Sequence, residues 1–296
     1  MDTTVRFYHG VLGARLVATL GTLSFRHYFF AIGEGSTVAF FEYHGTQHEP
    51  LRKPAGVPDA RAVQFDHLSL DVADEAAVAR LADAAFAEFG GVHLLCQNAG
   101  VSGGGGPSWE IPDNAWQWTF GVNLWSIVHG LRAFVPRMIA QGEGHIVNTA
   151  SSAGLKTLPF VAPYAATKHA VVAISEALCI ELGMFAPGLG VSVLCPGWVD
   201  TRIADSDRNW PAHLGEPPAA PEGGDDMREV SRGLLAAGIP PSTVATAVFD
   251  AVRADRFWVF PDGMGPRLAR ARMDEITGDT KPVITELYDG TDYAAD

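Results

Sequence analysis

Tyr164-Ala165-Ala166-Thr167-Lys168 is the stretch that decides the fold. It lies near the start of residues 162–182, a segment with the apolar spacing of a long helix. Small side chains along this segment allow a helix to approach a sheet closely. Two short apolar runs flank it, residues 146–149 before and residues 191–195 after. Both have the character of buried strands, so the region predicts a strand, a long helix and a second strand in succession.

Three polar side chains in this region suit proton transfer. Tyr164 and Lys168 lie one helical turn apart, and Ser151 follows the first predicted strand. A phenol has a pKa of about 10, so it exchanges protons near neutral pH only where a cation stabilises the phenolate. Lys168 supplies such a charge, and the Ser151 hydroxyl can hold a substrate carbonyl or alcohol oxygen beside the tyrosine. The three residues suit an oxidoreductase that acts on alcohols and ketones.

Other stretches decide whether this pair is more than a chance match, because Tyr-x-x-x-Lys occurs often on amphipathic helices. Leu70-Asp71-Val72, Asn98-Ala99-Gly100 and Asn123 precede the pair, and Pro196-Gly197-Trp198-Val199-Asp200-Thr201 follows it. In this order the stretches resemble the motifs of the short-chain dehydrogenase/reductase family, from about residue 68 to residue 282. Gln97 stands where that family usually has another asparagine.

The resemblance implies a role for each matching residue. Tyr164 is the implied general acid and base, and Lys168 lowers its pKa and binds the nicotinamide ribose. Ser151, which matches by its spacing better than Ser152, orients the substrate oxygen. Asn123 holds a water that links the lysine to a proton relay. The implied contacts to NAD or NADP are Asp71, Val72, Asn98, Ala99, Gly100, Tyr164, Lys168, Pro196, Gly197, Val199 and Thr201.

The resemblance also implies an α/β fold with a Rossmann-like doubly wound parallel sheet. Such a fold opens with a strand and a glycine-rich turn that brings backbone N–H groups to the pyrophosphate. Residues 1–71 contain no Thr-Gly-x-x-x-Gly-x-Gly sequence, so we expect a domain that is truncated at its N-terminal end. The glycines at residues 103–106 follow Asn98-Ala99-Gly100 and are expected to form a flexible connection.

The N-terminal residues 1–67 carry a different resemblance. Phe7-Tyr8-His9-Gly10-Val11-Leu12-Gly13 is similar to the end of the first helix in the vicinal oxygen chelate family, which includes glyoxalases and extradiol dioxygenases. Runs rich in aromatic and branched residues follow at residues 15–20, 26–32 and 37–43. They predict a meander of strands and hence an antiparallel, β-rich appendage.

Three functions are compatible with these two resemblances. The first is an NAD(P)-dependent oxidoreductase that interconverts a secondary alcohol and a ketone. The second is a catalytically silent fusion, joined near residues 70–76, with a defective cofactor site. The third is residual metal-dependent activity of the glyoxalase or dioxygenase kind, for which Glu42 and His67 match two ligand positions. Because catalytic metal sites generally use three or more protein ligands, we expect no metal centre.

Composition sets the remaining expectations. The 296 residues, 47% of them hydrophobic, suffice for a full core, divided here into residues 1–67, residues 68–282 and a loose acidic tail at residues 283–296. A net charge of −13 argues against nucleic acid or anionic membranes as partners, and no apolar run reaches the length of a membrane span. The cysteines Cys96, Cys179 and Cys195 fall in apolar segments and predict reduced, buried thiols in a cytoplasmic protein.

Other segments complete the predicted organisation. Residues 203–227 are crowded with proline, glycine and charge and predict a mobile loop, at the position where the dehydrogenase family has a substrate lid. Phe160, Trp198 and Trp210 offer apolar surface to a small-molecule alcohol or ketone, or else serve as packing. The remaining predicted elements are strands at residues 92–96 and 257–260 and helices at residues 114–141, 241–254 and 267–276. The helices at residues 114–141 and 162–182 resemble those of the family's oligomer interface, which implies a homodimer or homotetramer.

Overall fold

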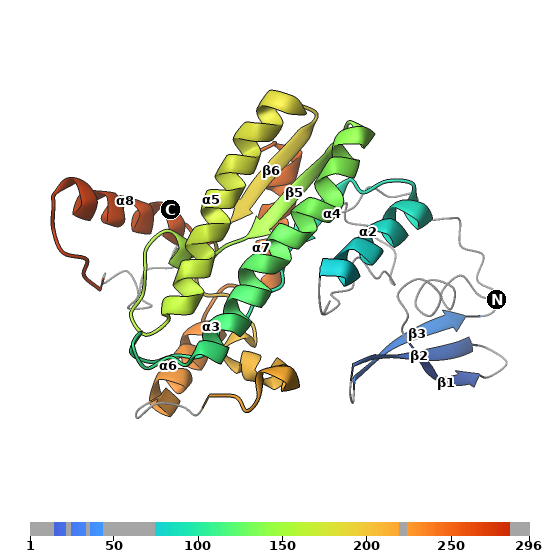
Figure 1. Cartoon of the computed structure of the whole chain (residues 1–296), viewed down its shortest axis with the longest axis horizontal. Coiled ribbons are helices and arrows are strands. Elements are labelled where there is room, and N and C mark those ends of the chain that lie inside the picture. The colour runs from blue at the N-terminus through green and yellow to red at the C-terminus, as the bar shows by residue number, and fades with distance from the viewer. Residues whose placement is uncertain (1–14, 22–24, 34–35, 44–74, 219–223, 285–296) are drawn as a thin grey trace. The chain divides into compact units, whose positions relative to one another are not determined.

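The computed structural model describes most of the chain, as two compact units (Figure 1). The described residues are 15–21, 25–33, 36–43, 75–218 and 224–284, with the backbone alone described for residues 15–43 and 224–227. The units are Met1–Val92 and His93–Asp296. His67, Asp71, Val72 and the predicted domain boundary after residue 67 lie outside the described residues. The predicted division of the chain at that point therefore stays a prediction.

The described residues of the first unit form a three-stranded antiparallel sheet and helix α2. Strands β1 (Arg15–Gly21), β2 (Phe25–Gly33) and β3 (Ser36–Tyr43) pair in the order β1-β2-β3. Helix α2 (Glu75–Phe89) ends at Gly90, whose positive φ of 73° suits glycine and whose N–H donates to the carbonyl of Phe86. The strands lie within one residue of the ranges predicted from the sequence. The resemblance of residues 1–67 to a vicinal oxygen chelate fragment, and the predicted truncation, stay predictions.

The second unit is built on a parallel sheet of four strands in the order β4-β5-β6-β7. The strands are β4 (Leu94–Gln97), β5 (Gly144–Thr149), β6 (Leu189–Leu194) and β7 (Trp258–Val259). All three neighbouring pairs are parallel. Because parallel strands need crossover connections, helices separate them in the sequence. This arrangement confirms the predicted α/β, Rossmann-like parallel sheet.

The two faces of the sheet carry separate apolar cores, because successive strand residues point to opposite sides. In β6, Val193 packs with Ile127 and Val171 from helices α4 (Ser126–Gln141) and α5 (Ala162–Phe185). Its neighbour Leu194 packs on the other side with Val248 of helix α7 (Pro241–Arg253). Figure 1 shows α4 and α5 in front of β5 and β6, with α7 behind. The central strands β5 and β6 are therefore buried on both faces.

The predicted helix at residues 114–141 contains an irregularity. It consists of α3 (Asp113–Phe120), a π-helical turn η2 (Gly121–Trp125) and α4, which ends at Gly142 with φ of 89°. A π-turn accommodates one residue more than a regular α-helical turn. The turn contains Asn123, one of the predicted site residues. The C-terminal helix α8 (Met264–Thr277) closes the unit.

The predicted mobile loop at residues 203–227 is wrong for the part of it that the structure describes. That part contains the 3-10 helices η4 (Ile203–Asn209) and η5 (Ala212–Leu214) and the start of helix α6 (Gly224–Ala236). Side-chain contacts from other elements hold η4 and η5 in place, as detailed below. Pro211 therefore lies between the two short turns η4 and η5.

Two composition-based expectations can be compared with the structure. In the described part of the chain, no helix is long and apolar enough to cross a membrane. All three cysteines are free; Cys195 is buried and Cys179 half-buried, whereas Cys96 is exposed. The prediction of a buried thiol is therefore wrong for Cys96.

Candidate active site

The predicted site residues meet at the carboxyl ends of the parallel strands, where ligands bind in open α/β sheets. The register aligns Gln97 of β4 with Asn148 of β5, and Thr149 of β5 with Leu194 of β6. The segments that follow these strands therefore start at one edge of the sheet. They carry Asn98-Ala99-Gly100, Ser151 and Pro196-Gly197.

Ser151, Tyr164 and Lys168 come together at this edge. Tyr164 lies half-buried in the first turn of α5, and the side chain of Ser151 is close enough to its phenol to affect the phenol pKa. The ammonium nitrogen of Lys168 lies 5.6 Å from the centroid of the Tyr164 ring. It also donates to the carbonyl of Thr149 at 2.8 Å. The Ser151 hydroxyl oxygen additionally accepts from the N–H of Ala153 at 3.1 Å, which fixes its position at the start of a 3-10 turn, η3 (Ser152–Gly154).

The electrostatics of the pair differ from the expectation. Burial raises the pKa of Tyr164 above its usual range, and the neighbouring Ser151 side chain lowers it only in part. Burial also lowers the pKa of Lys168 to about 8. The lysine charge is directed at a backbone carbonyl rather than at the phenol oxygen, so it does not overcome the desolvation of the tyrosine. Tyr164 is therefore a protonated phenol at neutral pH.

Asn123 joins two segments of the site. It is only 1% exposed, and its side chain accepts from the N–H of Val101 at 2.8 Å and donates to the carbonyl of Val101 at 3.0 Å. A second donor hydrogen bond, of 3.2 Å, reaches the hydroxyl of Thr167, which directly precedes Lys168. The asparagine thus ties the segment after β4 to the helical turn that carries Tyr164 and Lys168. The role of Asn123 in holding a water stays a prediction.

Gly100 lies beside both Lys168 and Asn123. A Cβ atom at Gly100 would lie 3.4 Å from the Lys168 nitrogen and 3.6 Å from the Asn123 amide oxygen. The absence of a side chain here keeps the space beside the ammonium group open. Asn98 and Ala99 are exposed at the same edge, and the Asn98 amide oxygen accepts from the hydroxyl of Thr149 at 2.9 Å.

Beneath the site, a hydrogen-bonded chain of polar side chains links β4, β5 and α5. The Gln97 amide nitrogen donates to Asn148 at 2.9 Å, and the Asn148 amide nitrogen donates to the hydroxyl of Ser175 at 3.0 Å. The Gln97 side chain occupies the space where a Cβ of Gly130 would lie. Gln97, which stands where the family has an asparagine, therefore lies against the small residue Gly130 on α4. In the sequence, Gln97 was the only indication of this series of hydrogen-bonded side chains.

The segment after β6 is fixed from two sides. The carbonyl of Pro196 accepts from the N–H of Ser152 at 2.8 Å. The N–H of Gly197 donates to the carboxylate of Asp262 at 2.6 Å. Further on, Val199 forms a parallel bridge with Ile239, and Thr201 is exposed. Asp262 was not identified from the sequence, because it lies far along the chain and in no recognised motif.

Cys195, at the end of β6, is a second buried group near the site that the sequence did not assign. Its side chain is fully buried, and burial raises the pKa of the thiol to about 12. Its electrostatic interaction with Lys168 places it near the ammonium group. At neutral pH it is an uncharged thiol, so it acts as packing and not as a nucleophile.

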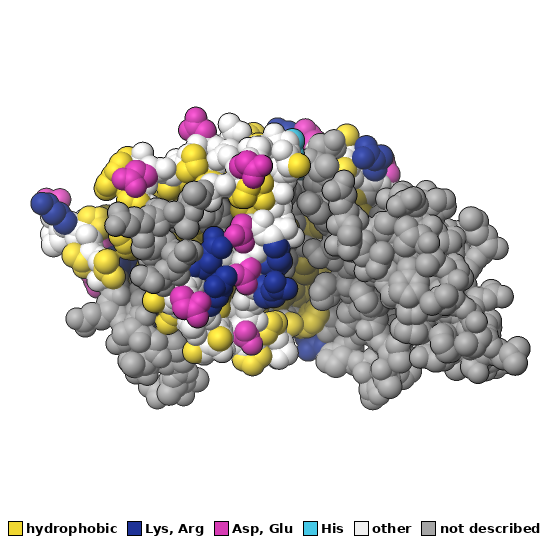
Figure 2. Space-filling model, turned by 90° about the horizontal axis from the view of Figure 1, so that it is seen from below, with side chains coloured by type: hydrophobic (Ala, Val, Ile, Leu, Met, Phe, Trp, Pro, Cys, Tyr) yellow, Lys and Arg dark blue, Asp and Glu magenta, His cyan; other side chains and the backbone are white. Residues whose placement is uncertain are grey.

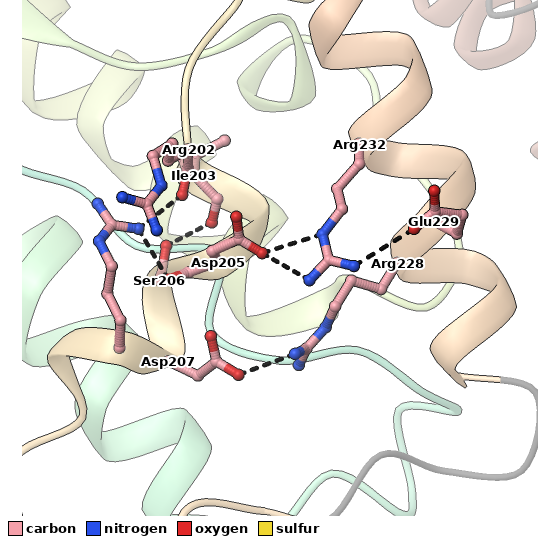
Figure 3. A network of polar contacts seen from close by, with 9 residues as sticks. Arg202, Ile203, Asp205, Ser206, Asp207, Arg228, Glu229 and Arg232 are labelled. Carbon is pink, nitrogen blue, oxygen red and sulfur yellow. Dashed lines mark hydrogen bonds and ion pairs between the residues drawn. The ribbon is translucent and has the colours of Figure 1, made fainter.

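The η4 segment lies next to the site and is held by charged and polar contacts (Figure 3). Asp205 pairs with Arg232 of α6 at 2.8 Å, and Asp207 pairs with Arg228 at 2.8 Å. The buried hydroxyl of Ser206 accepts from the N–H of Ser102, in the segment after β4. Figure 2 shows side chains of both charges interleaved on the face seen from below, the side on which α6 lies in Figure 1.

Aromatic and backbone contacts hold the remainder of this region. Trp210 packs edge-on against Trp118 of α3, with ring centroids 4.9 Å apart, and its indole N–H donates to the carbonyl of Gly215. Phe160 has a positive φ of 65°, and its carbonyl accepts from the N–H of Gly106 at 2.9 Å. The glycines at residues 103–106 are thus anchored at one end, although the sequence predicted a flexible connection.

Comparison with known proteins gives a consistent result. The family model described as short chain dehydrogenase matches residues 32–212, which starts upstream of the predicted limit at residue 68. The chain is 34% identical to 1-deoxy-11-beta-hydroxypentalenate dehydrogenase of Streptomyces exfoliatus, over 77% of this chain and 76% of that protein. It is 30% identical to the CLA biosynthesis dehydrogenase/reductase of Lactiplantibacillus plantarum, over 75% of this chain and 79% of that protein.

Solved structures agree with this assignment. A short chain dehydrogenase/reductase from Burkholderia phymatum in complex with NAD is 38% identical, with a TM-score of 0.69 over 72% of this chain and 76% of that chain. The apo form of LigO from Sphingobium sp. strain SYK-6 is 34% identical, with a TM-score of 0.55 over 72% of this chain and 68% of that chain.

Proposed function

Because the chain belongs to the short chain dehydrogenase family, and is therefore an oxidoreductase that uses NAD or NADP, we propose that Tyr164 is its proton donor and acceptor. The proposed reaction interconverts a secondary alcohol and a ketone. The observation that carries the proposal is the position of the Lys168 nitrogen, 5.6 Å from the centroid of the Tyr164 ring, with the Ser151 side chain close enough to the phenol to affect its pKa. These groups lie at the carboxyl edge of the parallel sheet, where a dinucleotide binds in this fold.

The described residues fit the nicotinamide end of the cofactor. Lys168 has three N–H donors and uses one on the Thr149 carbonyl, which leaves others for ribose hydroxyls. Gly100 leaves the adjoining space open. Asn98, Ala99, Pro196, Gly197, Val199 and Thr201 are the proposed neighbours of the cofactor in the described part of the chain. Asp71 and Val72 are proposed to contact the adenine end.

The proposed chemistry divides one reaction between two partners. When bound, the nicotinamide cofactor supplies or takes up the hydride at the substrate carbon. In ketone reduction, Ser151 holds the carbonyl oxygen and Tyr164 donates its phenolic proton to that oxygen as the hydride arrives at carbon. In alcohol oxidation, the tyrosine takes the hydroxyl proton. The raised pKa of Tyr164 keeps the phenol protonated at neutral pH, and this is the form that donates a proton in ketone reduction.

The proposed substrate is an apolar small molecule that carries one hydroxyl or ketone group. The name of the Streptomyces exfoliatus relative indicates a hydroxylated substrate. Trp210 and Phe160 supply aromatic surface near the segments that flank the site. The proposal includes a cytoplasmic location, which rests on the free cysteines, and assembly as a homodimer or homotetramer, which rests on the family resemblance.

Calorimetric titration of the purified full chain with NADH and with NADPH tests the cofactor part of the proposal. Tyr164→Phe is the matched variant, because it keeps the ring and removes only the hydroxyl. We expect both proteins to bind one cofactor with similar affinity, and only the wild type to oxidise or reduce a panel of secondary alcohols and ketones. Failure of the wild type to bind either cofactor would favour the catalytically silent fusion instead.

A further inference from the structure

A carboxylate outside the recognised motifs contacts the proposed cofactor segment. Asp262 follows β7, and its half-buried side chain accepts two backbone hydrogen bonds. One comes from the N–H of Gly197 at 2.6 Å and the other from the N–H of Met264 at 3.1 Å. Both acceptors are oxygens of the same carboxylate, so the side chain joins the loop after β6 to the start of α8.

Only the second of these bonds has an ordinary structural explanation. An aspartate just before a helix commonly accepts from an N–H of the first turn, as Asp262 does from Met264. The bond to Gly197 plays no part in starting that helix. It spans 65 residues of sequence and crosses from one loop to another at the carboxyl edge of the sheet.

The contact between Asp262 and Gly197 is tight. A Cβ at residue 197 would collide with the Asp262 carboxylate and would lie 2.9 Å from the sulfur of Met264. The glycine therefore permits the close approach of the backbone to the carboxylate. A hydrogen bond of an N–H to an ionised carboxylate is stronger than a bond between neutral groups, which suits a contact that must hold a loop.

The opposite side of the same loop is tied to the substrate-binding turn. The carbonyl of Pro196 accepts from the N–H of Ser152, next to Ser151. The two consecutive residues Pro196 and Gly197 are therefore held between Ser151-Ser152 and Asp262. Loss of either bond frees the loop from one neighbour while the other remains.

Burial affects the ionisation of the Asp262 carboxylate, which accepts the hydrogen bond from Gly197. It raises the pKa of Asp262, while the hydrogen bonds from Met264 and Gly197 lower it in part. The backbone donors therefore favour the ionised carboxylate and oppose the effect of burial.

We propose that Asp262 is a positioning residue for the cofactor site, which fixes the Pro196-Gly197 backbone at the nicotinamide end. The inference rests on the proposed function, because that function is what places the cofactor beside this loop. Asp262 acts through Gly197 and does not itself take part in proton or hydride transfer.

The test compares Asp262→Asn, Asp262→Ala and the control Asp250→Ala in the full chain. Asn has nearly the same shape as Asp but offers a single acceptor oxygen, so it cannot accept both bonds. Asp250 pairs with Arg253 on the exposed surface of α7, which makes its removal a matched loss of one aspartate. Hydrogen exchange of the peptide that contains Gly197 is measured first, followed by titration with NADH and NADPH.

In Asp262→Ala, which accepts neither bond, we expect Gly197 exchange to be about tenfold faster, the effect of losing one hydrogen bond. In Asp262→Asn the single acceptor oxygen serves one donor only, so exchange at either Gly197 or Met264 should be faster by that factor. The dissociation constant of the preferred cofactor should rise by a similar factor, with the substrate KM unchanged. The control should match the wild type in both measurements. If Asp262→Ala fails to fold, the measurements on Asp262→Asn decide whether the proposal holds.

Other outcomes overturn the proposal in distinguishable ways. Unchanged exchange at Gly197 in Asp262→Ala, or at both Gly197 and Met264 in Asp262→Asn, shows that the carboxylate does not hold the loop. Faster exchange with unchanged cofactor affinity shows that the bond is structural only. If the wild type binds neither NADH nor NADPH, the proposed function fails and this inference fails with it.

Discussion

The ammonium nitrogen of Lys168 donates a 2.8 Å hydrogen bond to the backbone carbonyl of Thr149, two residues before Ser151. This bond connects α5 to the end of β5 and fixes the distance between the lysine and the serine. It also directs one of the three N–H groups of the lysine away from Tyr164. The two remaining N–H groups of Lys168 are available for the proposed ribose contacts.

Replacement of Lys168 tests this arrangement. In Lys168→Ala the site loses a cation and a tether between α5 and β5. We expect kcat/KM for ketone reduction to fall by about 10²–10⁴, the usual range for loss of acid–base assistance. Steady-state kinetics measure the loss, with Lys281→Ala at an exposed position as the control. Activity near that of the wild type in Lys168→Ala would contradict the assignment.

The pH dependence of ketone reduction follows from two shifted pKa values. Lys168, with a pKa of about 8, is charged below that pH and loses its charge above it. Tyr164, with a raised pKa, stays protonated across the same range and remains able to donate. We expect kcat/KM for reduction to be constant below pH 8 and to fall above it. A rate that rises above pH 8 would show that the lysine charge is not required.

Gly154 separates the Ser151 turn from α5, and its replacement should drive them apart. A Cβ there would lie 2.6 Å from the carbonyl oxygen of Lys168, a backbone atom that cannot move aside cheaply. We expect Gly154→Ala to lower the free energy of unfolding by about 1–3 kcal/mol and to reduce turnover. Denaturant unfolding and kinetics measure both effects.

Gly233 offers the matched control for that substitution. It lies in α6, and a Cβ there would meet nothing within 4 Å. Gly233→Ala should stabilise the protein by about 0.5–1 kcal/mol, since alanine favours a helix over glycine, and should leave turnover unchanged. Equal destabilisation by the two substitutions would show that close contact is not the cause.

The ion pairs between η4 and α6 should set the exposure of η4 to proteases. In Arg232→Ala the pair with Asp205 is lost, and we expect faster cleavage within residues 202–216 with little change in global unfolding. High salt should have the same effect on the wild type, because the pairs are solvent-exposed and screened. Arg253→Ala removes a comparable surface pair on α7 and serves as the control. Cleavage that is insensitive to both salt and Arg232→Ala would contradict the role of these pairs.

His145 should make the stability depend on pH. It is 6% exposed, and its Nε2 lies 2.7 Å from the Ser192 hydroxyl oxygen. That hydroxyl donates to the carbonyl of Arg256, so Nε2 carries the proton of a neutral ring. Burial lowers the pKa of His145, and Asp255 at 3.8 Å raises it in part, because that carboxylate is mostly exposed.

A histidine with a lowered pKa in the folded state binds fewer protons than in the unfolded state as the pH falls. Its contribution to stability is therefore complete above about pH 6.5 and is lost as the pH falls through the folded pKa. Chemical denaturation at several pH values should show a free energy of unfolding that declines below pH 6.5. The decline should be smaller in His145→Gln, and an identical decline would assign the effect to other groups.

The sequence predicted the parts of the site that depend on local order. Ser151 follows a short apolar strand, and Tyr164 and Lys168 share one face of a helix, so their proximity follows from the period of the helix and the end of the strand. The parallel sheet then brings Gly100 and Pro196 to the same edge. The placement of these residues follows from the topology of the sheet, and the order of the motifs in the sequence indicated that topology.

The parts that escaped prediction depend on contacts between distant segments and on burial. The bond between Asp262 and Gly197 joins loops after different strands, and nothing in the local sequence of either residue indicates the other. The raised pKa of Tyr164 reflects the desolvation of its surroundings, whereas the sequence showed only its nearest cation. Ion pairs with the arginines of α6 hold η4 in place. The proline-rich composition of this region indicated a loop and gave no indication of these pairs.

The π-turn at Gly121–Trp125 makes the length of this helical segment difficult to alter. Each residue of an α-helix rotates the following ones by about 100°. Deletion of one residue would convert the turn to a regular helix and bring α3 and α4 into a single phase. The helix would then present either Asn123 or the core side chains of α4 correctly, but not both. A one-residue deletion here should thus be worse tolerated than most point substitutions, which leave that phase unchanged.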